Sequence, residues 1–275
     1  MLWQHFLPHH LLSRLVGVLA HSRISWIKNT FITWFIKRYQ VNMSLAAEPN
    51  PRNYPTFNDF FTRALKPNIR PIAPGENVII SPADGAISQL GNIHQGKIFQ
   101  AKGFDFSLNQ LLGGDETLAA PFSNGSFATI YLAPKDYHRV HMPLAGKLRE
   151  MIYIPGELFS VNTQSAASIP NLFARNERVV ALFDTPQGEM ALVLVGAMIV
   201  ASIETVWAGL IAPSRIKKIQ HWRYAADEIS LEKGAETGRF QLGSTVVALF
   251  SSVVAWEEQL KAGSLLSMGE SLGKN

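Results

Sequence analysis

From residue 78 to residue 250 the sequence is a succession of short apolar runs separated by turn residues. The runs are rich in Val, Ile, Leu and Phe, with Gly, Pro and Asp between them: 78–80, 86–87, 97–100, 127–132, 178–183, 190–203 and 246–250. Such runs are typical of β-strands. The run 190–203 is uncharged, but it is short and β-branched, so buried strands explain it better than a membrane span. We therefore predict a mainly β, sandwich- or barrel-like domain over residues 75–275, in a chain that is α+β overall.

A proline-rich segment precedes this domain. Residues 48–74 contain six prolines, which fix the backbone and interrupt regular structure. A short helix is expected at 57–65. This connector is the best candidate for a domain boundary in the chain.

The first 47 residues form a third region, which combines basic residues with large apolar residues. They contain five Arg and Lys and no Asp or Glu. The large apolar residues Ile24, Ile27, Phe31, Trp34 and Phe35 follow helical spacing, which predicts amphipathic helices. Basic residues interrupt every window long enough to span a bilayer. The stretch is also only weakly similar to a secretory signal. Such helices commonly lie in a membrane interface, and packing against the protein's own core is the alternative.

Composition excludes several chemistries. The chain has no Cys, so disulfides, thiolate nucleophiles and zinc–thiolate sites are excluded. Neither a Walker loop nor a Gly-x-Gly-x-x-Gly stretch occurs. His138 and His141 are three residues apart, but no compelling third ligand adjoins them, so a metal site is not expected. No nucleic-acid partner is expected either.

The dipeptide Gly243-Ser244 stands between two strand-like segments and raises a chemical possibility. The Ser244 hydroxyl can attack the carbonyl of Gly243 if a base removes its proton. His138 and His141 are candidate bases, and Asp84, in the turn SPADG, is a candidate for orienting one of them. For the dipeptide by itself, a β-bulge or a turn capped by Ser-Thr is the simpler explanation.

Six stretches in order resemble the bacterial type of the phosphatidylserine decarboxylase family, which also occurs in mitochondria. They are SPADG, DYHRVHMP, PGELFSVN, NERVV, VGAMIVASIETVWAG and KGAETGRFQLGSTVV. The resemblance extends from about residue 57 to residue 273. The basic N-terminal helices also resemble the membrane-associating segment of that family.

The resemblance implies that the chain cleaves itself between Gly243 and Ser244. Ser244 then becomes a covalent pyruvoyl group, which is the cofactor, and no metal is required. The products are a β chain, residues 1–243, and an α chain, residues 244–275, which stay together as a heterodimer. By the same resemblance Asp84, His141 and Ser244 form the self-cleavage triad, and His138 donates a proton during decarboxylation. Further pairing of the heterodimers is left open.

The implied reaction converts phosphatidylserine to phosphatidylethanolamine and CO2. The pyruvoyl ketone forms a Schiff base with the head-group amine and acts as the electron sink. Phe159, Ser160 and Asn162 match a stretch near the substrate. A peripheral location on the cytoplasmic face of an anionic cell membrane follows from the same resemblance. Two alternatives remain: a serine hydrolase with an intact Ser244, His141 and Asp84 triad, and a noncatalytic lipid-binding β domain.

Overall fold

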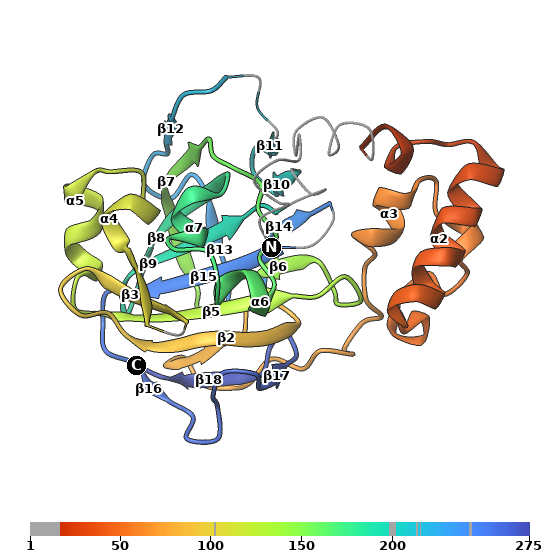
Figure 1. The fold of residues 1–275 in the computed structure, drawn as a ribbon. Helices are drawn as coiled ribbons and strands as arrows, with labels where there is room; N and C mark the ends of the chain where they lie inside the picture. Colours follow the sequence, from red (N-terminus) through yellow and green to blue (C-terminus); the bar gives the residue numbers. More distant parts are fainter. Residues whose placement is uncertain (1–16, 102, 198–201, 213, 215, 242–243) are drawn as a thin grey trace.

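Antiparallel β-sheets dominate the structure. The computed structural model describes residues 17–101, 103–197, 202–212, 214, 216–241 and 244–275. Gly243 and the first sixteen residues, which belong to the predicted cleavage site and to the predicted N-terminal helices, lie outside the described residues. Figure 1 shows the β body with a helical part beside it.

Nine of the described strands form the largest sheet. Its central path runs β12 (Gln220–Arg223), β7 (Gly146–Ile154), β8 (Arg178–Thr185), β9 (Gly188–Val195), β15 (Ser244–Phe250), β5 (Ser126–Leu132), β2 (Gly85–Asn92) and β17 (Leu265–Leu266). The short strand β13 (Ser230–Leu231) also pairs with β7. All of these pairings are antiparallel.

The other described strands form three smaller sheets. A four-stranded sheet has the order β11 (Gly209–Ala212), β10 (Ile203–Thr205), β14 (Glu236–Phe240) and β6 (Arg139–His141). A three-stranded sheet joins β1 (Val78–Ile80), β18 (Ser271–Lys274) and β16 (Ala255–Trp256), and β3 (Lys97–Ala101) pairs with β4 (Phe104–Ser107). Short helices complete this body: α4 (Leu108–Leu111), α5 (Glu116–Ala119), η4 (Ala120–Phe122), α6 (Thr163–Ala166) and α7 (Leu172–Arg175).

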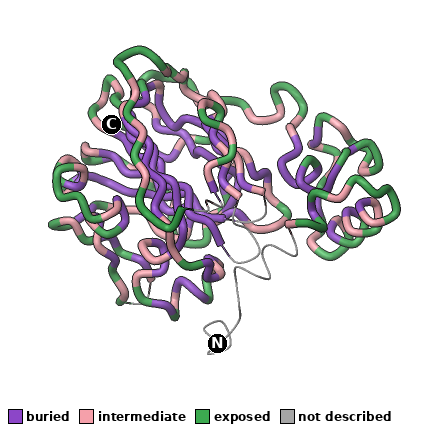
Figure 2. Tube along the Cα trace, turned by 90° about the horizontal axis from the view of Figure 1, so that it is seen from above, coloured by how far each residue is buried: buried purple, intermediate pink, exposed green. Residues whose placement is uncertain are grey.

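Strand β15 separates two hydrophobic cores. All seven of its residues are buried, and successive side chains of a strand point to opposite faces of its sheet. Val246 and Ala248 accordingly belong to a core shared with the four-stranded sheet, which contributes Val140 and Phe240. Val247 and Leu249 belong to the other core, under the short helices. Figure 2 shows the buried strands as the purple centre of the molecule.

The helical part has its own core. It comprises α2 (Ser25–Tyr39), η2 (Met43–Leu45), η3 (Pro51–Asn53) and α3 (Phe57–Phe61). The buried residues of α2 are Lys28, Ile32 and Phe35, and Phe35 contacts the ring of Phe57 at a centroid distance of 5.1 Å. No described helix combines the length and apolarity required to cross a bilayer.

The predicted helical face differs from the observed one. The helix at α2 is present, but Ile24 and Trp34 of the predicted apolar stripe are about half exposed, and Trp26 is 73% exposed. The amphipathic pattern is therefore not confirmed, because large apolar side chains lie on both the buried and the exposed sides. Packing against α3 buries Ile32, which is outside the predicted stripe, and Phe35, which belongs to it.

The mainly β prediction for the rest of the chain is confirmed. The runs 78–80, 97–100, 127–132, 178–183 and 246–250 all lie in strands. The run 190–203 divides between β9 and β10, which belong to different sheets. The sheets formed by the described strands are open, and none closes into a barrel.

The close approach of Gly125 to β15 gives a test of this packing. A Cβ atom built on Gly125 would lie 1.9 Å from the carbonyl oxygen of Phe250, whereas one on Gly17 would meet nothing within 4 Å. We expect Gly125→Ala to cost at least about 2 kcal/mol, which lowers the melting temperature by roughly 5 °C or more. Gly17→Ala is the matched control and should leave it unchanged. Equal melting temperatures in a thermal scan would contradict this close approach.

Candidate active site

Ser244 is the first residue of β15 and is fully buried. It pairs with Leu132 of β5, its exposure is 0%, and its hydroxyl has no hydrogen-bond partner in the described part of the chain. The same strand alternation that buries Val246 aims Ser244 at the four-stranded sheet. An unpartnered buried hydroxyl costs about 1–3 kcal/mol, and such groups require an explanation. A chemical role for this hydroxyl is one such explanation.

His141 lies in β6, and both of its ring nitrogens have partners. Nδ1 lies 2.9 Å from the carbonyl oxygen of Gly234, so it carries the proton and donates. Nε2 therefore accepts from the Tyr137 hydroxyl at 3.0 Å. Burial lowers the pKa of His141, against smaller raising effects that include Glu236 and Asp84. His141 is thus neutral at pH 7, with a lone pair on Nε2, which is the form of a general base.

Tyr137 keeps its proton in this arrangement. Burial raises the pKa of Tyr137 to about 12, so at neutral pH its hydroxyl is a donor to His141. The phenol occupies the nitrogen through which His141 would accept a proton from another group.

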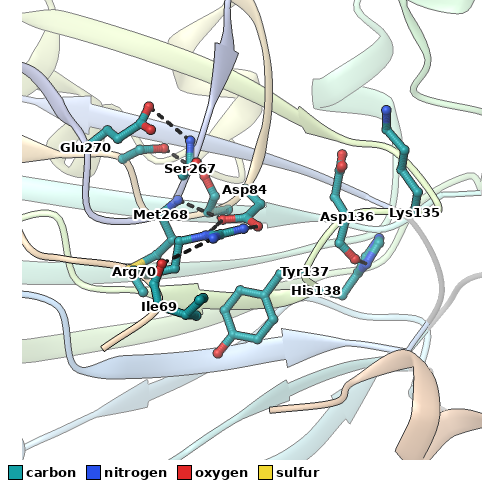
Figure 3. Close-up of polar contacts among 12 residues, drawn as sticks. Ile69, Arg70, Asp84, Lys135, Asp136, Tyr137, His138, Ser267, Met268 and Glu270 are labelled. Atoms are coloured by element: carbon teal, nitrogen blue, oxygen red, sulfur yellow. Dashed lines mark hydrogen bonds and ion pairs between the residues drawn. The ribbon is translucent and has the colours of Figure 1, made fainter. Parts of the chain in front are cut away.

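Asp84 acts electrostatically on His141, but Figure 3 shows that its oxygens face other partners. Arg70 binds it bidentately, with Nε to Oδ1 at 2.9 Å and Nη2 to Oδ2 at 2.5 Å. The Met268 amide also donates to Oδ1, at 2.8 Å. A backbone hydrogen bond links the segments that carry Asp84 and His141. The His141 amide donates to the carbonyl of Pro82, two residues before Asp84, at 2.8 Å.

Hydrogen bonds do not join the predicted triad. Among the described residues no hydrogen bond links Asp84, His141 and Ser244 to one another. His141 lies in β6, which pairs with β14, and the next strand along the chain is β15, whose first residue is Ser244.

His138 is completely buried and has one free nitrogen. Its Nδ1 donates to the carbonyl oxygen of Asp136 at 2.9 Å, and its Nε2 has no partner among the described residues. Its ring lies 4.0 Å from that of Phe61, centroid to centroid. The backbone amide of Phe240, four residues before Ser244, donates to the carbonyl of His138. Burial is the main cause that lowers the pKa of His138 to about 3; the hydrogen bond to Asp136 opposes this shift, and the charge of Arg63 adds to it.

The predicted substrate segment lies at the same end of the sheet as Ser244. Phe159 is buried, and its amide and carbonyl both bond the side chain of Asn176. Asn176 also donates to the carbonyl of Gly196, immediately after β9, and the last residue of β9 pairs with Thr245. Ser160 is partly exposed, and Asn162 caps α6 through a bond from the Ser165 amide.

Sequence reasoning missed Arg70, Tyr137 and Gly234. Tyr137 stands inside the quoted stretch DYHRVHMP, so its nearness to the histidines could have been suspected. Arg70 lies in the proline-rich connector, where no periodicity indicates a partner. Gly234 acts through its carbonyl, which leaves no residue-type signal. Within the described residues, no group of three or more His, Cys, Asp and Glu side chains is arranged to hold a metal ion.

Burial of neutral His138 predicts a pH-dependent stability. The unfolded chain takes up a proton near the ordinary pKa of 6.5, whereas the folded chain does so only near 3. Stability should therefore fall as the pH falls from 6.5 toward 3. Between pH 6.5 and pH 5 this one group contributes a loss of up to about 2 kcal/mol.

Urea unfolding at several pH values measures this loss. In a Ser244→Ala background, which keeps each variant a single chain, His138→Asn should flatten the dependence between pH 6.5 and pH 5. His94→Asn is the control, because His94 is exposed. A His138→Asn curve parallel to that of the unmodified background would refute the neutral, buried state.

Comparison with known proteins shows the family of the chain. Residues 57–274 match the family model described as phosphatidylserine decarboxylase, and residues 1–40 match one described as PSD. A phosphatidylserine decarboxylase proenzyme of Pseudomonas putida strain F1 is 61% identical over 98% of this chain and 95% of its own length. Proteins of the same name from Pseudomonas fluorescens Pf0-1 and Stutzerimonas stutzeri A1501 are each 60% identical, over 99% and 98% of this chain and 96% and 92% of theirs. The chain belongs to the phosphatidylserine decarboxylase family.

Proposed function

We propose that this protein decarboxylates phosphatidylserine to phosphatidylethanolamine and CO2, after cleaving itself between Gly243 and Ser244. The observation that carries the proposal is the buried, unpartnered hydroxyl of Ser244 at the start of β15. Two neutral histidines lie on the adjoining segments. The relatives support it, because they are named proenzymes of this activity.

The proposed self-cleavage begins with attack of Ser244 Oγ on the carbonyl carbon of Gly243. His141 takes the hydroxyl proton through Nε2, the peptide C–N bond breaks, and an ester replaces the amide. Removal of the Ser244 α-proton then expels the Gly243 carboxylate and leaves dehydroalanine. Water converts this to a ketone and releases ammonia, so one water is consumed and one ammonia is formed.

This assignment requires His141 to exchange one hydrogen bond. Tyr137 holds Nε2 in the structure, so its hydroxyl must turn away or pass the proton on when Ser244 reacts. Gly234 holds Nδ1–H in place and fixes the tautomer. Asp84 acts from a distance, by favouring the protonated form of His141.

In the second reaction the residues have different tasks. The pyruvoyl group made from Ser244 supplies a ketone that condenses with the substrate amine and an adjacent carbonyl that withdraws electrons. His138 gives a proton to the α carbon after CO2 leaves. Since the pKa of His138 is about 3 in this structure, His138 must gain that proton in the presence of substrate, whose negative charges favour the imidazolium.

Cleavage would leave both chains in place. Strand β15 pairs with β5 over all seven residues, Ser244 to Phe250, and with β9 from Thr245 to Phe250. Because both ladders survive cleavage of the preceding peptide bond, chains 1–243 and 244–275 would remain a heterodimer.

We propose peripheral attachment to the cytoplasmic face of the membrane through residues 1–47, with 48–74 as connector and 75–275 as catalytic domain. Exposed Trp26 and Trp34 support this, as do Lys37 and Arg38 in the last turn of α2. Tryptophan favours the membrane interface, and basic residues near anionic lipid contribute about 1 kcal/mol each.

Variants of the four site residues should separate the two reactions. Ser244→Ala, His141→Ala and Asp84→Ala should stay full-length and inactive on a denaturing gel, because each lacks part of the self-cleavage machinery. His138→Ala should still cleave, while phosphatidylserine turnover falls by about two to four orders of magnitude. Normal cleavage in His141→Ala together with an uncleaved His138→Ala would reverse the two roles. A full-length Ser244→Ala variant that still decarboxylates would end the proposal.

Membrane attachment is best tested at exposed positions. Deleting residues 1–47 would also expose the aromatic core of α3, so Trp26→Ser with Trp34→Ser is the cleaner change. We expect much weaker flotation with anionic liposomes. The matched control is Val253→Ser with Leu265→Ser, which removes equally exposed apolar residues of the β body. Equal flotation of both double variants would place the contact elsewhere.

A further inference from the structure

Arg63 is a buried cation at the junction between the helical part and the β body. It follows α3, and it is 4% exposed. None of the ion pairs among the described residues includes it. A buried charge without a counter-charge is costly.

Only part of its guanidinium is hydrogen-bonded. Nη2 donates to the carbonyl oxygens of Lys135 at 3.0 Å and Asp136 at 3.3 Å. Nε and Nη1, which carry three N–H groups, have no partner among the residues that the structure describes. The ring of Phe60 lies 5.5 Å from the guanidinium carbon, which offsets part of the cost. Burial lowers the pKa of Arg63, a sign that its charge is poorly solvated.

Arg63 and His138 share one acceptor. The carbonyl oxygen of Asp136 receives both Arg63 Nη2 and His138 Nδ1, so the two side chains lie on either side of one peptide group. Phe61, two residues before Arg63, contacts the His138 ring. The free donors of Arg63 therefore lie beside the group that we assign to protonation.

We propose that Arg63 binds the phosphodiester of the lipid head group beside His138 and so holds the substrate at the site. This inference rests on the proposed function, since it assumes phosphatidylserine as substrate. Its position supports it: α3 lies between α2, with its exposed tryptophans, and the β body, where Arg139 donates to the carbonyl of Thr62 at 2.9 Å. A lipid held at the helices reaches the β body beside Arg63.

The head group has two anions, and the chemistry favours the phosphodiester. Decarboxylation removes the negative charge of the carboxylate. A guanidinium paired with that carboxylate would stabilise the substrate more than the transition state and slow the reaction. The phosphodiester keeps its charge throughout, so its pairing with Arg63 lowers the cost of binding without raising the barrier.

Steady-state kinetics on mixed micelles of phosphatidylserine and detergent test the proposal. Arg63→Gln should still self-cleave. Its KM should rise roughly 10- to 100-fold, as expected for loss of hydrogen bonds to a charged group, with kcat nearly unchanged. Arg63→Lys keeps the positive charge but lacks the planar guanidinium with its several donors, and it should show a smaller rise in KM. It also serves as the test variant if Arg63→Gln does not fold.

Arg178→Gln is the matched control. Arg178 is also buried without a carboxylate partner, but its Nε, Nη1 and Nη2 donate to the carbonyls of Leu111, Asn176 and Gln110. It should lose stability in a thermal scan and keep the KM of the unmodified enzyme. A KM rise common to both variants would show a general effect of losing a buried arginine and overturn the proposal.

Two inhibitors distinguish the anions. Glycerol 3-phosphate offers a phosphate without a carboxylate, and acetate offers the reverse. Glycerol 3-phosphate should compete with substrate in the unmodified enzyme and lose potency in Arg63→Gln, whereas any acetate inhibition should not change. Loss of acetate inhibition alone, or a fall in kcat at constant KM, would assign Arg63 to the carboxylate or to the chemistry and contradict the phosphodiester.

The failure of this inference differs from failure of the proposed function. If the unmodified enzyme releases no CO2 from phosphatidylserine, the proposed function itself is contradicted. If the unmodified enzyme is active, and Arg63→Gln and Arg63→Lys both keep its KM, only the binding role of Arg63 is removed.

Discussion

Two ladders of antiparallel hydrogen bonds hold β15 in the middle of the largest sheet, and the site depends on them. They fix Ser244 against Leu132 and Thr245 against Val195. Because β15 runs from Ser244 to Phe250, the residue has a hydrogen-bonded strand on its carboxyl side. Cleavage of the peptide bond before Ser244 would leave both ladders intact. This is the arrangement that a chain requires if it is to cut itself and stay folded.

Unpaired polar groups occur at the proposed site. In the described part of the chain, the hydroxyl of Ser244, Nε2 of His138 and two nitrogens of Arg63 are buried without partners. Each costs free energy. Other buried atoms, such as Thr129 Oγ1 and Trp256 Nε1, are unpaired as well, so the absence of a partner does not locate the site by itself. Asp84 differs, because Arg70 and Met268 donate to its carboxylate.

Much of the fold could be predicted from the sequence, because short β-branched runs between turn residues have few other solutions. The location of Ser244 at a strand start follows from the Gly-Ser step before Val246-Val247. Side-chain partners could not be predicted. Asp84 was expected to orient His141, but its oxygens bind Arg70, which lies in the irregular connector. The amphipathic pattern of α2 was not confirmed, because apolar residues occupy both sides and only packing against α3 decides which side is buried. The roles of Asp84, His138 and His141 stay predictions that rest on resemblance and on neighbourhood.

Intact-mass measurement of the purified, active protein tests the central claim most directly. The account predicts two chains, residues 1–243 and 244–275, with the smaller chain lighter by one ammonia than a peptide that begins with serine. It also predicts that this chain resists Edman degradation, since it has no terminal amine. A single chain of 275 residues that still decarboxylates phosphatidylserine, or a small chain with a readable Ser244 terminus in fully active protein, would contradict it.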